Sequence, residues 1–222
     1  SDWVLETRVG SVETAALSSA HWAGVLDLTA APAQQAVNTT TAESQTATAG
    51  RAVAINPVDG SSVVVWMSHN QDGDAGGIYL QRFDANGDPL GGEVQVNTIT
   101  TGEQTAPALA MNDNGTFVVV WQSENVDGNG WGIVAQRFDA SGNALGGEII
   151  VNDTTINDQT MPDVGIDMAG NFVVVWADHA LDGSGDGIYA RRFLADGSPA
   201  SGEFHVADTS TNDQFEPAVA MN

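Results

Sequence analysis

The sequence contains no cysteine and no lysine. Without cysteine, neither a disulfide framework nor a thiolate metal site can form. All six basic residues are arginines, and they face 29 aspartates and glutamates, which gives a net charge of −23 at pH 7. Nucleic acids and anionic membrane surfaces bind through basic residues, so this charge argues against both as partners. The surface favours cations instead.

Long hydrophobic runs are also missing. No apolar stretch approaches the ~20 residues that a membrane helix needs, so we expect no membrane insertion. The opening residues, SDWVLETRVG, lack the basic and apolar regions of a signal peptide. With 42% hydrophobic residues in a chain of 222, there is enough apolar surface for a globular core.

One phrase occurs three times in the chain. Its middle copy, Val118 to Glu148, reads VVVWQSENVDGNGWGIVAQRFDASGNALGGE. The residues that recur at intervals of 55 include Trp66, Trp121 and Trp176; Asp72, Asp127 and Asp182; Phe83, Phe138 and Phe193; and Glu93, Glu148 and Glu203. A period this strict, without insertions, predicts one structural unit stacked in a fixed geometry.

Each unit is expected to form four short strands. In the middle unit these are residues 107–111, 116–123, 132–138 and 148–153, separated by turn signals. The unbroken run VVVW is typical of a strand that is covered on both faces. The pattern therefore predicts an all-β fold, a β-propeller of four-stranded antiparallel blades in which the recurring aromatic residues form the core between blades.

The two ends of the chain predict how the ring closes. Residues 214–222 match only the first strand of a unit, and the N-terminal residues supply candidates for the other three. We expect one domain over residues 1–222 with four blades, built from 1–45 plus 214–222, and from about 46–103, 104–158 and 159–213. Such closure removes both open edges. A dimeric ring, or a piece of a longer array, remains an alternative.

The phrases GIYLQRFDANGDPLGGEVQVNT and GIVAQRFDASGNALGGEIIVND resemble repeats of very large secreted or surface proteins of bacteria. Such repeats often accompany RTX-type calcium-binding and adhesin modules. The resemblance covers about residues 45–222. It implies an extracellular or cell-surface location and a calcium-rich setting.

Loops between the second and third strands gather on one face of such a disc. In these loops oxygen-bearing side chains alternate with glycine, as calcium coordination by six to eight oxygens requires. The candidate metal ligands are Asp72, Asp74, Asp127, Asn129, Asp182, Ser184 and Asp186. Each loop provides only two or three of them. An Asp before Gly also caps its own turn without a metal, so plain Asx turns are the alternative.

Trp131 is the candidate ligand contact. It stands where the sibling units have Gly76 and Asp186, so the architecture does not require it. An exposed indole beside Asp127 and Asn129 suits stacking on a sugar ring. The alternative is a tryptophan packed against its own loop or the next blade.

Other recurring positions have structural interpretations. His69, Glu124 and His179 share one repeat position and are expected at the surface. The recurring arginines Arg82, Arg137 and Arg192 are expected to pair with the recurring glutamates.

Nucleophile signatures are missing from the sequence. It contains neither G-x-S-x-G nor H-E-x-x-H, and no carboxylate pair stands out. We therefore expect no enzyme, but an extracellular, calcium-binding structural or adhesive module of a bacterial protein. Its expected partners are Ca²⁺ and a carbohydrate or a cell-surface protein. The alternative is a glycan-binding, lectin-like propeller.

Overall fold

The computed structural model describes residues 36–41, 44–48, 51–179, 181, 183, 185–206 and 212–221. The chain divides into two units, Ser1–Val37 and Asn38–Asn222, and every described strand belongs to the second. The described residues form strands and no helix. Accordingly, this part of the chain contains no helix that is long and apolar enough to cross a membrane.

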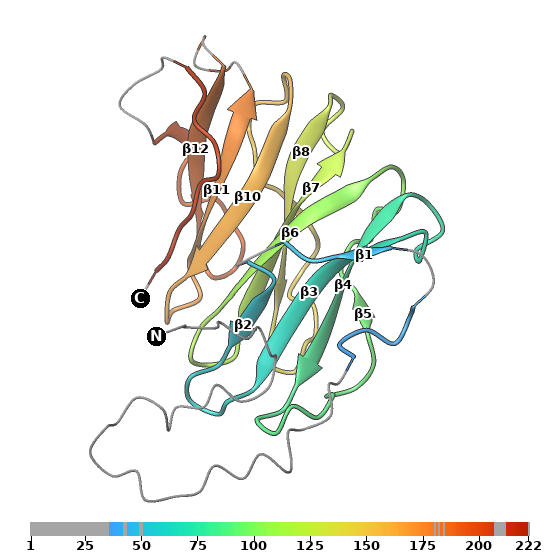
Figure 1. The fold of residues 1–222 in the computed structure, drawn as a ribbon. Coiled ribbons are helices and arrows are strands. Elements are labelled where there is room, and N and C mark those ends of the chain that lie inside the picture. Colours follow the sequence, from blue (N-terminus) through green and yellow to red (C-terminus); the bar gives the residue numbers. More distant parts are fainter. Residues whose placement is uncertain are drawn as a thin grey trace, which may run out of the picture. The chain divides into compact units, whose positions relative to one another are not determined.

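The strands form three antiparallel sheets, each ordered along the chain (Figure 1). Sheet A contains β1 (Gln45–Thr46), β2 (Val53–Ile55), β3 (Ser62–His69), β4 (Gly76–Phe83) and β5 (Val94–Gln95). Sheet B contains β6 (Gln104–Met111), β7 (Phe117–Glu124), β8 (Trp131–Phe138) and β9 (Ile149–Ile150). Sheet C contains β10 (Gln159–Ile166), β11 (Phe172–His179), β12 (Asp186–Phe193) and β13 (Phe204–His205).

The sheets confirm the predicted all-β, propeller-like class. Each repeat forms one sheet with the expected order of four strands, and in sheet A the short strands β1 and β2 together take the place of the first strand. The fourth blade stays a prediction, because residues 1–35 lie outside the described residues.

The VVVW strands lie in the core between sheets. In β7, Val119 and Trp121 pack with Val65 of sheet A. Their neighbours Val118 and Val120 point to the other face and pack with Trp176 of sheet C. Both faces of sheet B are therefore covered, which explains why its central strand lacks the usual polar alternation.

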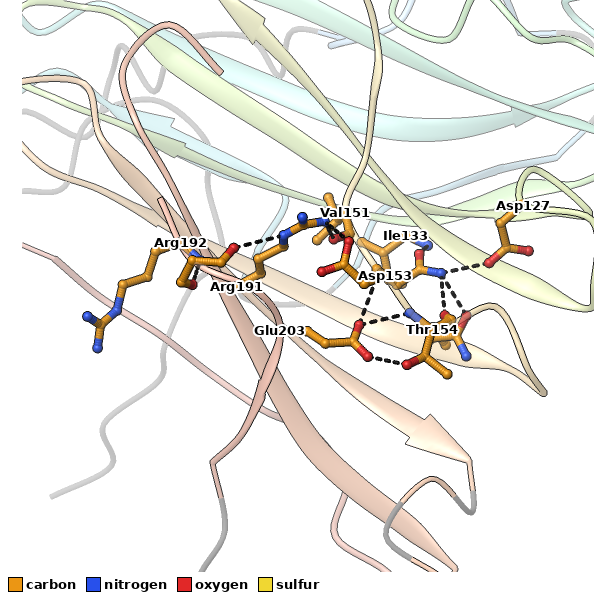
Figure 2. A network of polar contacts seen from close by, with 11 residues as sticks. Asp127, Ile133, Val151, Asp153, Thr154, Arg191, Arg192 and Glu203 are labelled. Atoms are coloured by element: carbon orange, nitrogen blue, oxygen red, sulfur yellow. Dashed lines mark hydrogen bonds and ion pairs between the residues drawn. The ribbon is translucent and has the colours of Figure 1, made fainter. Parts of the chain in front are cut away.

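Polar contacts also connect neighbouring sheets. The Glu203 carboxylate accepts hydrogen bonds from the backbone amides of Asp153 and Thr154, at 2.8 and 3.1 Å, and from the Thr154 hydroxyl (Figure 2). Glu148 binds Thr98 in the same way. The recurring glutamates thus hold the end of the preceding unit's fourth strand.

The expected pairing of recurring arginines with recurring glutamates is wrong. Arg82 donates to the carbonyl oxygens of Ala140 and Ser141, in a turn of sheet B. Arg137 donates likewise to Ala195 of sheet C, at 2.5 Å. A guanidinium group has several donors in a planar arrangement, so it can hold a turn whose carbonyl groups point outward.

The segment Gln214–Met221 has the bend of a first strand. Glu216 has a φ of 55°, as Ala106 and Met161 have φ of 51° and 54° at the same repeat position, each before a proline. Gly165 of β10 allows this segment to come close, since a Cβ there would lie 3.2 Å from the backbone nitrogen of Met221. Among the described residues the segment is part of no sheet.

Trp121 and Trp131 provide a test of the division between core and surface tryptophans. Trp121→Ala should lower the free energy of unfolding by about 3 to 5 kcal/mol, because the indole is 1% exposed in the core between sheets A and B. Trp131→Ala should cost much less, since Trp131 is half-buried and its equivalents are Gly76 and Asp186. Urea denaturation of both variants measures the contrast. Equal losses would show that Trp131 belongs to the core.

Candidate functional site

Nine residues lie where the second and third strands of each sheet join. In every unit they are the last residue of the second strand, the first residue of the third, and the acidic residue that precedes the next first strand or, for Asp213, the segment Gln214–Met221. We call them the loop-face rim: His69, Gly76 and Glu103; Glu124, Trp131 and Asp158; His179, Asp186 and Asp213.

Backbone contacts make this rim continuous from sheet to sheet. The Glu103 carbonyl oxygen accepts the amide of Glu124 at 2.9 Å, and the Asp158 carbonyl oxygen accepts that of His179 at 2.9 Å. The Asp158 carboxylate also accepts the amide of Trp131 at 3.1 Å. Asp158 therefore joins the third strand of sheet B to the second strand of sheet C.

His179 and Asp186 form the closest side-chain pair of the rim. His179 Nδ1 lies 2.7 Å from Asp186 Oδ1, across the register that pairs β11 with β12. The hydrogen bond to Asp186 and the charge of that carboxylate raise the pKa of His179, and the charges of Asp158 and Asp213 add to the rise. Both side chains are accessible, at 58% and 36% exposure. The pair can therefore hold and release a proton at the surface.

Asp178 lies directly before His179 and is fully buried. Among the described residues, neither carboxylate oxygen has a hydrogen-bond partner. Burial raises the pKa of Asp178 to about 7; the nearby polar groups of Gln159 and Trp176 offset part of the effect, while the charge of Glu203 adds to it. The equivalent residues of the other sheets are Ser68 and Ser123, so the fold does not require a carboxylate here.

Asp72 and Asp127, both proposed as metal ligands, hold their own loops. Asp127 Oδ2 accepts the side-chain amide of Asn152 at 2.6 Å, and Asp72 Oδ2 accepts that of Asn97 at 3.1 Å. The other carboxylate oxygen of Asp127 accepts the backbone amide of Asn129 at 3.2 Å. The contact with Asn129 is that of the Asx-turn alternative, and the contacts with Asn152 and Asn97 fix the loops to the ends of the fourth strands.

The remaining proposed ligands are separated. Asp74 accepts the backbone amides of Ala75 and Gly102, while Asp186 pairs with His179. Asp182 and Ser184 lie outside the described residues. Within the described ranges no group of three or more His, Asp or Glu side chains is placed to hold a metal ion. Calcium binding stays a prediction.

The His179–Asp186 pair was missed in the sequence, although a signal for it was present. The hairpin register places the last residue of each second strand opposite the first residue of the third. Applied to the third repeat, this register would have paired a histidine with an aspartate. For Asp178 the indication in the sequence was weaker: this residue is an aspartate at a position where the other two units have serine.

The chain matches no protein-family model and no curated protein. Solved structures with a similar arrangement of strands exist. An endo-arabinase from Bacteroides thetaiotaomicron VPI-5482 is 17% identical with a TM-score of 0.42, over 81% of this chain and 61% of that one. A thermostable family-43 glycoside hydrolase is 11% identical with a TM-score of 0.45, over 71% and 53% of the two chains. An endo-1,4-β-xylanase from the same Bacteroides species is 12% identical with a TM-score of 0.46, over 71% and 60%.

These neighbours correct the functional expectation. All three are enzymes that act on glycosides, and none is described as an adhesion module or a lectin. The expectation of a calcium-binding adhesive module without enzymatic activity is therefore withdrawn, together with its lectin-like alternative. The chain spans about 53 to 61% of the neighbours' lengths, and the likeness concerns the arrangement of strands alone.

Asp178→Ser tests the cost of the buried carboxylate. The folded-state pKa is raised, so the contribution of Asp178 to stability is present at low pH and is lost as the pH rises from about 4 to about 7. The serine variant should gain roughly 4 kcal/mol of unfolding free energy at pH 8, and little at pH 4. Urea denaturation at both pH values measures this difference.

Asp196→Ser is the matched control for Asp178→Ser. Asp196 is fully exposed, and hydrogen bonds from Ser198 lower its pKa. This variant should not gain stability at pH 8. If Asp178→Ser is as stable as the wild type at both pH values, the ionised Asp178 carboxylate does not destabilise the folded protein.

Proposed function

We propose that the loop-face rim is the active site of a carbohydrate-processing hydrolase. The observation that carries the proposal is the 2.7 Å contact between the exposed imidazole of His179 and Asp186. Hydrolysis requires one group that protonates the leaving oxygen and another that takes a proton from the attacking water. A histidine whose pKa is raised by a carboxylate keeps its proton to higher pH than a free histidine, which suits the first role.

The second role falls to the neighbouring acids. Asp158 and Asp213 are exposed on the rim, on either side of the pair, and their charges act on His179. Asp158 is fixed by the amide of Trp131, and Asp213 by that of Asp186 at 3.3 Å. Each carboxylate is thus oriented by backbone while a second oxygen remains for water or substrate.

The charge of the rim selects the substrate class. Aspartates crowd the site in a chain of net charge −23, so anionic substrates are repelled. Neutral sugars carry hydroxyl groups that donate to carboxylates, and their ring faces stack on indole. Trp131 supplies an indole on the same rim, and its backbone amide donates to Asp158.

The bacterial repeats that the sequence resembles support an extracellular or cell-surface setting for this activity. Neutral polysaccharides are substrates that such a protein meets outside the cell. A long polysaccharide extends past the loop-face rim, so we expect it to contact other parts of the surface as well.

The activity test uses a panel of neutral polysaccharides, including arabinan and xylan, with anionic pectate for comparison. The wild type should release reducing ends from a neutral polymer and none from pectate. His179→Asn and Asp186→Asn should each lower kcat/KM by about 100-fold or more, as removal of a general acid or its partner does. Wild-type activity should fall as the pH rises through the raised pKa of His179.

Asp196→Asn is the control for the activity test, because it removes a carboxylate from the turn at the opposite end of β12. Its activity should equal that of the wild type. Absence of hydrolysis by the wild type on the whole panel would overturn the proposed function. Full activity in the His179 and Asp186 variants would place the active site elsewhere.

A further inference from the structure

A cavity of about 360 Å³ lies between the first strands of the units, away from the rim pair. Residues of β2, β6, β10 and the segment Gln214–Met221 line it. Its apolar lining includes Leu109, Met111, Val164, Ile166, Val219 and Met221. Small-molecule sites commonly have volumes of roughly 300–1,000 Å³, apolar walls and a few placed polar groups.

Two charged residues face each other in this cavity. Arg51 Nε lies 3.9 Å from Asp163 Oδ1, and their side chains are only 19% and 11% exposed. The other nitrogens of Arg51 donate to the carbonyl oxygens of Pro162, at 3.4 Å, and Pro217. Asp163 Oδ2 accepts the amide of Val219 at 2.8 Å. Two backbone segments, β10 and Gln214–Met221, therefore fix the positions of the two charges.

The repeat does not require either charge. In the strand register, the residues equivalent to Arg51 are Pro107, Pro162 and Pro217. Those equivalent to Asp163 are Ala52, Ala108 and Ala218. An ion pair among apolar side chains commonly costs more in desolvation than its attraction returns. The fold therefore does not need the pair, and both of its side chains line the cavity.

Among the described residues, Arg51 Nε and Asp163 Oδ1 have no hydrogen-bond partner. At 3.9 Å, Arg51 Nε and Asp163 Oδ1 are too far apart for a hydrogen bond to each other. The cavity therefore presents one donor and one acceptor side by side, with apolar surface beyond them. A carboxylate head group is repelled by Asp163, and an amidinium by Arg51.

We propose that this cavity binds a small neutral molecule with an apolar body and a head group, such as a carboxamide, that bridges Arg51 and Asp163. The head-group oxygen accepts from Arg51 Nε, and its N–H donates to Asp163 Oδ1. The apolar body lies against Val164 and Ile166. This site is independent of the proposed hydrolysis on the rim.

Three probes of one shape test the site: benzamide, benzoate and benzamidine. Titration is followed by NMR chemical-shift changes of the Val164 and Ile166 methyl groups. Wild-type protein should bind benzamide at least about tenfold more tightly than either charged probe. Asp163→Ala should shift the preference to benzoate, and Arg51→Met should shift it to benzamidine. Asp163→Ala copies the alanine that sibling units carry at this position, and Arg51→Met removes the charge while it keeps an unbranched side chain.

The result that overturns the proposal is equal binding of the three probes, or shifts that do not involve the cavity methyl groups. Unchanged preferences in the variants would likewise show that the Arg51–Asp163 pair only braces the strands. If Asp163→Ala does not fold, the isosteric Asp163→Asn removes the same charge and should also remove the penalty on benzoate. Hydrolytic activity is not read in this experiment, so its outcome is separate from that of the rim variants.

Discussion

Sheet B is buried on both faces only because sheets A and C cover them. Val119 and Trp121 of β7 pack toward sheet A, while Val118 and Val120 pack toward sheet C. The glutamate contact persists in the longer unit of sheet A, since Glu93 binds Thr39 across 54 residues where Glu148 binds Thr98 across 50. The interval of 55 residues between the recurring tryptophans reflects the same apolar residues presented to each neighbouring sheet.

The same constraint separates architecture from chemistry. Residues that pack against the neighbouring sheet are the same in each unit. Residues at the strand ends, and some residues of the first strands, differ between units. The rim carries histidine, glutamate, tryptophan or glycine at equivalent places without a change in the backbone contacts that hold it. Arg51 and Asp163, which lie at and beside the first strands, likewise differ from their equivalents in the other units. Functional side chains in a repeat of this kind are those that break its pattern.

The sequence was sufficient for the strands and their order, because hydrophobic runs and turn signals are local. It was not sufficient for contacts between units. The arginines were expected to pair with glutamates, since opposite charges attract, but a rigid turn in the next sheet offers Arg82 better-placed carbonyl groups. The interval from Gln45 to Gln104 is 59 rather than 55 residues, because the first strand of sheet A is split into β1 and β2. Periodicity alone does not locate such an insertion.

The rim pair was missed for a related reason. Repeat alignment compares His179 with His69 and Glu124, which share its position, and so presents it as an isolated surface residue. The chemistry depends on Asp186, which is its partner across the hairpin and not along the repeat. Comparison across strands within one unit would have been needed to find it.

Asp178 connects this rim to the interior between sheets B and C. Adjacent residues of a strand point to opposite faces, so His179 reaches the surface where Asp178 enters the core. The positive charge of His179 lowers the pKa of Asp178 in part, against the larger effect of burial. Such coupling is reciprocal, since each charged form favours the other. Ionisation of the buried carboxylate therefore favours the protonated imidazole, and the proton affinity of the rim depends on the packing of the two sheets behind it.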